Sequence, residues 1–228
     1  FPGKMPERRR IALAMMAAID DGVGRIRDRL ADHKLTENTL IFFISDNGAP
    51  LKADMKDLPL SHKKGAWNGS RNDPWVGEKG MLTEGGIRVP FIVTWPSRLP
   101  TGKIYKHPVS SLDVGATAVE LAGLSKDSKL DGMNLIPHLT DKVKAPPHKK
   151  LFWRFWRQAA VREGKWKYYQ AGDRKYLFDL SSPEHEKVNL IKKYPVLADE
   201  VEASPQSWAK PPKNPSLPTG QLNGAELK

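Results

Sequence analysis

The residues best suited to chemistry in this chain follow a short apolar run and offer oxygen atoms to a cation. The run at residues 39–44 (TLIFFI) leads directly into Ser45-Asp46-Asn47-Gly48. Asp46 carries a carboxylate and Asn47 a carbonyl oxygen, and hard oxygen donors of this kind suit Ca²⁺ or Mg²⁺. The same residues also commonly form an Asx turn that caps a loop. Their types alone therefore leave open both a metal site and a purely structural turn.

A second group of residues could bind an anion. Lys79 lies in Gly77-Glu78-Lys79-Gly80, shortly before residues 84–90 (EGGIRVP). Glycines let a backbone approach an oxyanion, and a lysine is a point-charge donor to sulfate or phosphate. The spacing is not that of a phosphate-binding P-loop. On its own, Lys79 is better explained as a solvated loop lysine.

The elements that must position these residues read as half of an α/β unit. Residues 6–30 repeat apolar side chains at helical spacing, and Pro6 suits a first helical turn. The continuous run at Leu40–Ile44 favours an interior strand buried on both faces, as in a parallel sheet covered by helices. Such a strand delivers Asp46 to its carboxyl end, where ligands bind in open α/β sheets.

Two further elements are expected after the long polar stretch at residues 45–86. Residues 87–95 form a second strand, in which Pro90 indicates a strand start or an edge position. Residues 113–122 form a helix, with Asp113 as its N-cap and Gly123 at its end.

The composition changes after Pro146-Pro147, which divides the chain into an α/β region at residues 1–147 and a smaller unit at residues 148–210. Residues 151–180 are dense in aromatic side chains and hold four short β-like runs separated by turn residues such as Glu163-Gly164. They predict a small antiparallel sheet with one helix, residues 195–208, packed on it. The Pro-rich tail at residues 211–228 is expected to be disordered.

The charge balance favours anionic partners. The chain has 228 residues, a formal net charge of +11 and no cysteine. A basic balance attracts sulfated or phosphorylated ligands, although it also fits a basic surface with no specific partner. We find no Arg-rich arm or nucleic-acid motif, and no apolar run long enough for a membrane span. The absence of cysteine excludes disulfides, zinc-thiolate sites and cysteine nucleophiles within these residues.

Taken together and in order, several stretches of this chain resemble the type I sulfatases, an arylsulfatase-like family with a formylglycine nucleophile. The likeness covers roughly residues 6–190 and matches the C-terminal portion of the family. Each stretch is weak alone, but the ordered set is specific. The stretches are residues 18–24 (AIDDGVG), 45–48 (SDNG), 77–80 (GEKG), 84–90 (EGGIRVP), Trp95-Pro96, 113–123, Asp131-Gly132, 177–180 (LFDL), Pro183-Glu184 and Asn189-Leu190.

The resemblance implies a fold, an activity and a set of roles. The fold is α/β, part of the helix-flanked mixed sheet of the alkaline-phosphatase-like sulfatases plus a small C-terminal antiparallel sheet with one helix. The activity is hydrolysis of a sulfate ester, possible substrates including sulfated carbohydrates. Asp46 and Asn47 would complete a divalent-metal site, usually calcium, with Mg²⁺ as the other option. Lys79 would contact the substrate sulfate during catalysis.

The resemblance also implies that part of the active site lies upstream of Phe1. The family's nucleophile is a hydrated formylglycine made from Cys or Ser in a Cys/Ser-x-Pro/Ala-x-Arg motif, and two metal-binding aspartates and Lys and His partners also lie upstream. Residues 94–98 (TWPSR) have Pro and Arg at the right offsets. However, oxidation of Thr94 could give only a ketone, so we interpret the match as coincidence. This chain alone is expected to be inactive.

Weaker candidates lie in three other places. The polar loop residues His62, Lys63, Lys64, Asn68 and Asn72 could line a substrate pocket, with His62 the one named for substrate binding, although loop polar residues are usually solvated. Asp20-Asp21 could mimic paired metal ligands, but an amphipathic helix favours a solvated or structural role. The aromatic and arginine residues at 153–157 fit a cross-strand core better than nucleic-acid stacking. Glu84 and Arg88 are expected to brace the loop internally.

Two other functions remain open from the residues alone. A phosphate or phosphonate ester hydrolase of the same architecture would use the same metal and lysine, because tetrahedral oxyanions look alike to both. A non-catalytic basic module that binds sulfated polysaccharide would need no metal and would bind in a salt-sensitive way.

Overall fold

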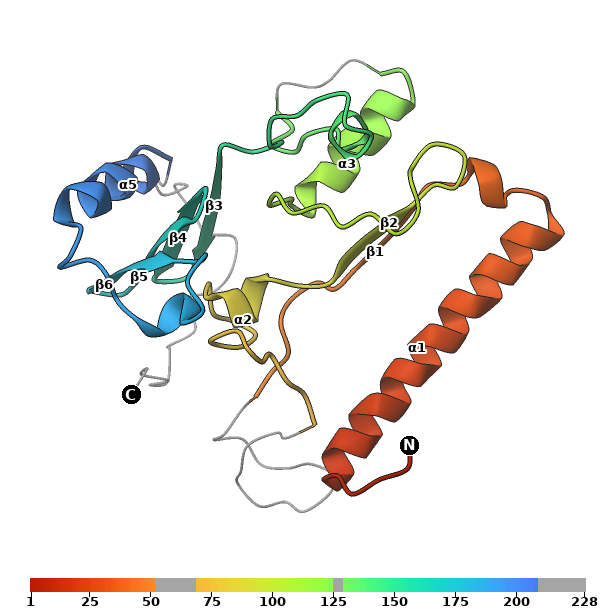
Figure 1. Cartoon of the computed structure of the whole chain (residues 1–228), viewed down its shortest axis with the longest axis horizontal. Coiled ribbons are helices and arrows are strands. Elements are labelled where there is room, and N and C mark those ends of the chain that lie inside the picture. Colours follow the sequence, from red (N-terminus) through yellow and green to blue (C-terminus); the bar gives the residue numbers. More distant parts are fainter. Residues whose placement is uncertain (52–68, 125–128, 209–228) are drawn as a thin grey trace.

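The structure, a computed structural model, describes residues 1–51, 69–124 and 129–208 (Figure 1). Its elements in chain order are α1 (Glu7–Asp32), η1 (Thr36–Asn38), β1 (Ile41–Ile44), α2 (Glu84–Ile87), β2 (Phe91–Thr94), α3 (Leu112–Leu121), α4 (Ile136–Leu139), β3 (Lys150–Phe155), β4 (Gln158–Glu163), β5 (Trp166–Ala171), β6 (Arg174–Asp179), η2 (His185–Lys187) and α5 (Pro195–Trp208). No helix in this described part is long and apolar enough to cross a membrane.

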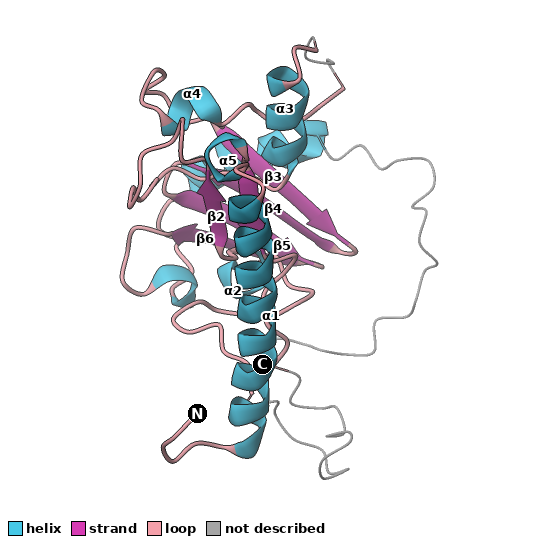
Figure 2. Cartoon of the chain, turned by 90° about the vertical axis from the view of Figure 1, so that its right-hand side faces the viewer, coloured by secondary structure: helices cyan, strands magenta, loops and turns pink. Residues whose placement is uncertain are grey.

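The long N-terminal helix is confirmed. Pro6 precedes its first residue, and the helix runs two residues beyond the predicted end. It lies apart from most of the molecule in Figure 1 and runs in front of the other elements in the turned view of Figure 2, and none of its side chains is buried. Its amphipathic pattern therefore has no covering surface among the described residues.

The strand after this helix exists, but its predicted surroundings are wrong. β1 pairs with β2, and the pairing is antiparallel, with Ile44 opposite Phe91. Within the described residues it has no second neighbour, and the Phe43 side chain is 41% exposed. A continuous apolar run indicates burial on both faces but carries no information on the direction of the neighbouring strand. The described residues therefore hold two small antiparallel sheets and no large mixed sheet.

Local signals place the remaining elements of the N-terminal region well. The strand predicted at residues 87–95 is shorter than expected: β2 begins directly after Pro90, which has no backbone N–H to pair, and Ile87 instead ends α2. The helix predicted from Asp113 is α3, which begins one residue earlier with Ser111 at the N-cap. Gly123 follows α3 with φ +73°, the left-handed conformation that ends helices.

The C-terminal region forms the predicted antiparallel sheet, in the order β3-β4-β5-β6. Its predicted turn at Glu163-Gly164 is present, with Gly164 at φ +56°, and a second turn has Gly172 at φ +60°. The helix α5 covers one face of this sheet, where Val201 packs with Val161 and Tyr168 (Figure 1). The predicted disordered tail lies outside the described residues.

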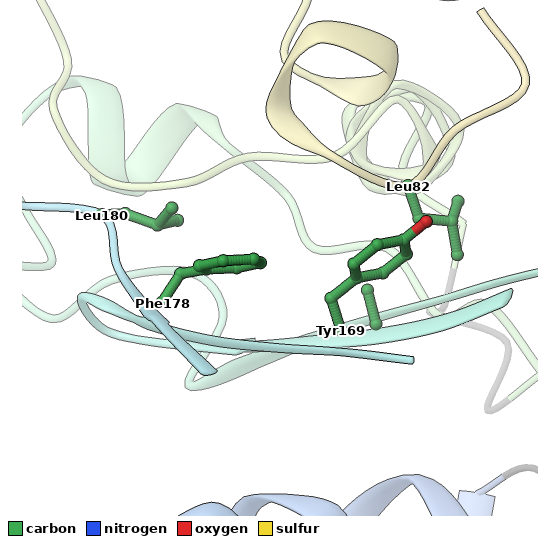
Figure 3. Packing of buried hydrophobic residues seen from close by; sticks show 5 residues of the cluster. Leu82, Tyr169, Phe178 and Leu180 are labelled. Atoms are coloured by element: carbon green, nitrogen blue, oxygen red, sulfur yellow. The ribbon is translucent and has the colours of Figure 1, made fainter. Parts of the chain in front are cut away.

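The opposite face of the sheet packs against the N-terminal region. Leu82, from the segment before α2, joins Tyr169, Phe178 and Leu180 in one buried cluster (Figure 3). The Tyr169 ring extends from β5 toward Leu82 in this view. A separate cluster around Leu135 packs against β1 and β2. The segment that carries Lys79 thus lies between the two regions.

Candidate functional site

The Asp46-Asn47 pair lies at the carboxyl end of β1, as predicted. The backbone N–H of Ser45 donates to Pro90 O (3.2 Å), and that of Gly48 donates to Gly86 O (2.8 Å), so the residues that lead into β2 fix both ends of the turn. Asn47 Nδ2 donates to Asp46 Oδ2 (2.6 Å). This bond orients the amide and leaves its oxygen available as a second hard donor beside the carboxylate.

Lys79 reaches the same cleft as this pair. Ile44, Asp46, Asn47 and Lys79 all line one cleft of about 920 Å³. The two segments also meet through their backbones, because the Lys79 N–H donates to Ala49 O (3.4 Å). The structure therefore brings together three of the four predicted site residues. The fourth, His62, lies outside the described residues, as do Lys63, Lys64 and Asn68.

Asn72 has a different place from the one the sequence suggested. It does not appear among the residues that line the cleft. Its side chain instead joins the two segments from behind: Oδ1 accepts from Ala49 N–H (2.9 Å), while Nδ2 donates to Ala49 O (2.8 Å) and Gly77 O (3.0 Å). Asn72 therefore adds side-chain hydrogen bonds to the backbone contact between the Asp46 and Lys79 segments.

The glycines around the site serve backbone packing. A Cβ on Gly48 would meet Gly85 O at 1.8 Å, one on Gly85 would meet Gly77 O at 2.3 Å, and one on Gly86 would meet Met81 O at 2.0 Å. No side chain fits at such distances. At Gly85 and Gly86, where the sequence suggested room for an anion, the glycines instead permit close approach of chain to chain, and Gly48 in its turn does the same.

A largely buried charge cluster adjoins the cleft. Lys167 from β5 is fully buried and contacts Glu84 Oε1 (2.9 Å) and Glu186 Oε1 (2.8 Å). Glu186 Oε2 also accepts from the Glu84 backbone N–H (2.6 Å). Arg88 and Arg162 lie 3.5 and 3.8 Å from Glu84 Oε2. The prediction that Glu84 and Arg88 brace the loop is confirmed, and the brace extends to the C-terminal sheet.

The pKa values of the two carboxylates in this cluster are shifted in opposite directions. Burial opposes ionisation of Glu84, but Lys167 and the two arginines together hold its pKa below the ordinary value. Burial raises the pKa of Glu186, which has Lys167 as its main cationic neighbour and Glu84 as an opposing charge. Glu84 is therefore the carboxylate that the cluster keeps ionised.

The cleft is predominantly cationic. Its lining includes six lysine and arginine residues and two acidic ones, Asp46 and Glu84. The basic residues are Lys79, Arg88, Lys103, Lys106, Arg154 and Arg162. Because Glu84 is already paired, Asp46 is the acidic group left to attract a cation. Sequence reasoning did not single out Lys103 and Lys106, which lie in a segment without a recognisable motif.

The remaining candidates are divided: residues 153–155 line the cleft, whereas Asp20, Asp21, Thr94 and Trp156 do not. Asp20 and Asp21 are exposed on α1 and do not line the cleft. Thr94 pairs with Ile41, at the end of the β1–β2 ladder that is farther from Asp46. Trp153 packs against the buried cluster of Figure 3, in keeping with a cross-strand core. Trp156 lies in the turn between β3 and β4 and is 48% exposed.

No group of three or more His, Cys, Asp or Glu residues capable of holding a metal exists in the described part of the chain. The donor types of Asp46 and Asn47 fit a hard divalent cation, which takes six or more oxygen ligands. The oxygens of Asp46 and Asn47 are ligands of the right type for such a cation, but two residues do not provide enough of them. They can serve as part of a larger ligand set.

Comparisons with known proteins give the family to which the chain is similar. A family model described as Sulfatase matches residues 7–124, and one described as N-sulphoglucosamine sulphohydrolase, C-terminal, matches residues 75–203. Arylsulfatase H of Homo sapiens is 40% identical over 133 residues, which cover 57% of this chain and 22% of that protein. N-acetylgalactosamine-6-sulfatase of Canis lupus familiaris is 37% identical over 131 residues, covering 54% and 23%. The chain thus spans about a fifth of these relatives.

Solved structures extend the likeness to the fold. Ps i-CgsB in complex with k-i-k-neocarrahexaose has a TM-score of 0.77 and 31% identity, covering 91% of this chain and 44% of that one. The phosphonate monoester hydrolase of Agrobacterium radiobacter has a TM-score of 0.64 at 22% identity, covering 85% and 39%, a likeness of fold alone. Since each family model matches more than half of its residues in the order of the motifs above, this chain belongs to the sulfatase family.

Proposed function

We propose that the protein hydrolyses sulfate esters, and that this chain supplies two metal ligands and a sulfate-binding lysine to the active site. The observation that carries the proposal is the meeting of Asp46, Asn47 and Lys79 at one cleft, although about 30 residues of sequence separate the pair from the lysine. A cation and an ammonium can act on one sulfate only if their donors flank it closely.

Asp46 and Asn47 would hold Ca²⁺ or Mg²⁺ through the carboxylate and the amide oxygen. When bound, the cation would supply positive charge close to the sulfate oxygens. The hydrogen bond between the two side chains holds the Asn47 amide next to the Asp46 carboxylate. Further anionic ligands must come from outside the described residues, so binding by this chain alone should be weak.

Lys79 would bind the sulfate group and neutralise the charge that develops on its oxygens in the transition state. Asn72 supports this role by tying the lysine's segment to that of Asp46. The cationic lining of the cleft favours entry of an anionic ester and disfavours a neutral one. The backbone contact between these segments supports a position of Lys79 near the proposed metal ligands.

The nucleophile has no counterpart here. The chain contains no cysteine, and Thr94 lies away from the cleft. We therefore propose that a formylglycine outside this chain completes the site, and that residues 1–228 alone are inactive. Sulfated carbohydrates are the proposed substrate class, because the structure of Ps i-CgsB was determined with a neocarrahexaose.

The test uses the full-length enzyme and two substitutions. Lys79→Ala should lower turnover by roughly 10²–10³, the scale for loss of one preorganised donor. Asp46→Ala should remove the activity that calcium restores to chelator-treated wild type. Lys165→Ala is the control, since Lys165 pairs with Asp179 on the C-terminal sheet and does not line the cleft. Normal turnover in the Lys79→Ala variant would refute the assigned roles.

The same preparation separates the esterase classes. Matched aryl sulfate, phosphate and phosphonate esters should be hydrolysed with the highest kcat/KM for the sulfate. A higher value for the phosphonate ester would favour the related hydrolase instead. Retention on a heparin-like polymer with no turnover of any ester would favour a binding module.

A further inference from the structure

The first residue of β4 connects the C-terminal sheet to the segment that carries Lys79. Gln158 Nε2 donates to Gly80 O (2.8 Å), and Gln158 Oε1 accepts from the Leu82 N–H (3.1 Å). A single side chain therefore holds both ends of the three residues that follow Lys79. The two bonds span 78 and 76 positions of sequence.

A neighbouring tyrosine fixes the orientation of this amide. Tyr169 OH donates to Gln158 Oε1 (2.8 Å), and the Tyr169 side chain is only 2% exposed. Burial, with smaller contributions from Tyr176 and Glu186, raises the pKa of Tyr169 to about 12, so the hydroxyl keeps its proton at neutral pH. With two donors on Oε1, the amide cannot flip without placing N–H against N–H and O–H. Nε2 is therefore directed at Gly80.

Lys79 is thus held between two amide side chains from different parts of the chain. Asn72 bonds to Gly77 on its N-terminal side, and Gln158 bonds to Gly80 and Leu82 on its C-terminal side. The lysine's own backbone bond, to Ala49, is long at 3.4 Å. The Gly80 backbone has φ +91°, a conformation that glycine adopts freely, so the residue itself does not fix the course of the chain. Its carbonyl bond to Gln158 supplies that constraint from outside.

We propose that Gln158, oriented by Tyr169, is a positioning residue for Lys79, so that the C-terminal sheet sets the geometry of the sulfate site. The proposal rests on the sulfate-binding role of Lys79 proposed above. Gln158 acts through the Gly80–Leu82 backbone and touches no reacting group. Loss of its bonds releases the backbone segment after Lys79. The lysine, the metal ligands and Asn72 are still present, so only the positioning of the lysine is altered.

The decisive experiment is a double-mutant cycle in the full-length enzyme, with turnover of 4-nitrophenyl sulfate and calorimetric binding of inorganic sulfate as the two measurements. Gln158→Leu should lower kcat about 10- to 100-fold, the scale for misplacing a catalytic group by about 1 Å. Adding Gln158→Leu to Lys79→Ala should change kcat by less than about twofold, because residues that act through one another are not additive. Inorganic sulfate should bind more weakly to Gln158→Leu, and no more weakly to the double variant than to Lys79→Ala.

Three further variants separate positioning from a loss of folding. Gln158→Glu keeps an acceptor for Leu82 and Tyr169 but removes the donor to Gly80, and it should fall between wild type and Gln158→Leu. Tyr169→Phe keeps the ring and removes one bond, so it should show a smaller loss and serves as the test if Gln158→Leu does not fold. Gln170→Leu is the matched control, since Gln170 bonds to Gly172 O in its own turn (2.9 Å), and it should match wild type.

The outcomes distinguish this inference from the function beneath it. If Lys79→Ala lowers turnover and sulfate binding while Gln158→Leu multiplies that loss in the double variant, Gln158 has a general structural role and the inference is wrong. If Lys79→Ala changes neither measurement, the sulfate-binding role fails and the inference falls with it. Loss in Gln158→Leu that disappears on the Lys79→Ala background supports both.

Discussion

The two ends of this molecule differ in how much of their own surface they bury. In the C-terminal sheet, Val161, Tyr168 and Leu177 have no exposed side-chain surface. In α1, the Met16 and Ile19 side chains are 64% and 55% exposed, and no residue of the helix is buried. Both regions carry apolar side chains at the spacing of their elements. The antiparallel sheet finds its partners nearby in the chain, whereas α1 finds none among the described residues.

The difference teaches where the chain is self-sufficient. Consecutive hairpins with short turns need only local contacts, and α5 follows closely enough to cover one face. A helix and a pair of strands from an α/β layer need neighbours on several sides. Because the chain spans about a fifth of its curated relatives, those neighbours can belong to the remainder of a full-length enzyme.

The largest expected effect concerns residues 1–228 expressed alone. They should bind a hydrophobic dye and aggregate, because an uncovered helix face and strand edge expose apolar surface. Size-exclusion chromatography and dye fluorescence measure this. Replacing the exposed Met15, Met16 and Ile19 with lysine should reduce dye binding. A monomeric, cooperatively unfolding wild-type product with sulfatase turnover would contradict both the comparison and the expected inactivity.

The next effect tests the buried charge cluster that connects the N-terminal region to the C-terminal sheet. Lys167→Met in the full-length enzyme leaves Glu84 and Glu186 buried without their shared cation, and removing one partner of a buried ion pair costs about 3–5 kcal/mol. Denaturant unfolding measures the loss. The matched control is Lys165→Met, which removes a more exposed pair with Asp179 and should cost at most about 1 kcal/mol. Equal losses would show that the cluster does not hold the regions together.

A pair of core truncations tests the contrast itself. Leu177→Ala should destabilise the full-length enzyme by about 2–5 kcal/mol, the range for a buried leucine. If another segment covers α1 in that enzyme, Ile19→Ala should fall in the same range despite its exposure here, as measured by chemical unfolding. A loss below about 0.5 kcal/mol would identify α1 as a surface helix and remove the reason given for aggregation.

The smallest effect is pH-dependent and confined to the C-terminal sheet. Hydrogen bonds from Lys165 and then Ser181 lower the pKa of Asp179 from 3.8 to about 2. A lowered folded-state pKa adds stability above pH 3.8 that disappears as the pH falls toward 2. Asp179→Asn should therefore lower stability at pH 5, by at most about 1 kcal/mol, and match wild type near pH 2. Thermal unfolding across this range measures it, and a difference that grows toward pH 2 would contradict the assignment.

Local sequence patterns predicted most of the helices and strands. The resemblance of the ordered motifs to the sulfatase family predicted that Asp46, Asn47 and Lys79 share a cleft. Pro6, Pro90 and the turn glycines act on their own backbone, so their consequences are readable in sequence. The direction of the strand beside β1 was not readable, because an apolar run does not encode its neighbour. Asn72 and Gln158 were missed as braces for a related reason. Their partners lie 23 and 78 positions away, and an isolated amide has no pattern that announces them.

The glycine contacts around the cleft have a consequence for how this family can diverge. Gly48, Gly85 and Gly86 face carbonyl groups so closely that even alanine would separate the two segments. Lineages that acquire new substrates can change the side chains lining the cleft but should retain these three glycines. Invariance at those positions would then record an old constraint on backbone spacing, and it would persist in descendants that had lost sulfatase activity altogether.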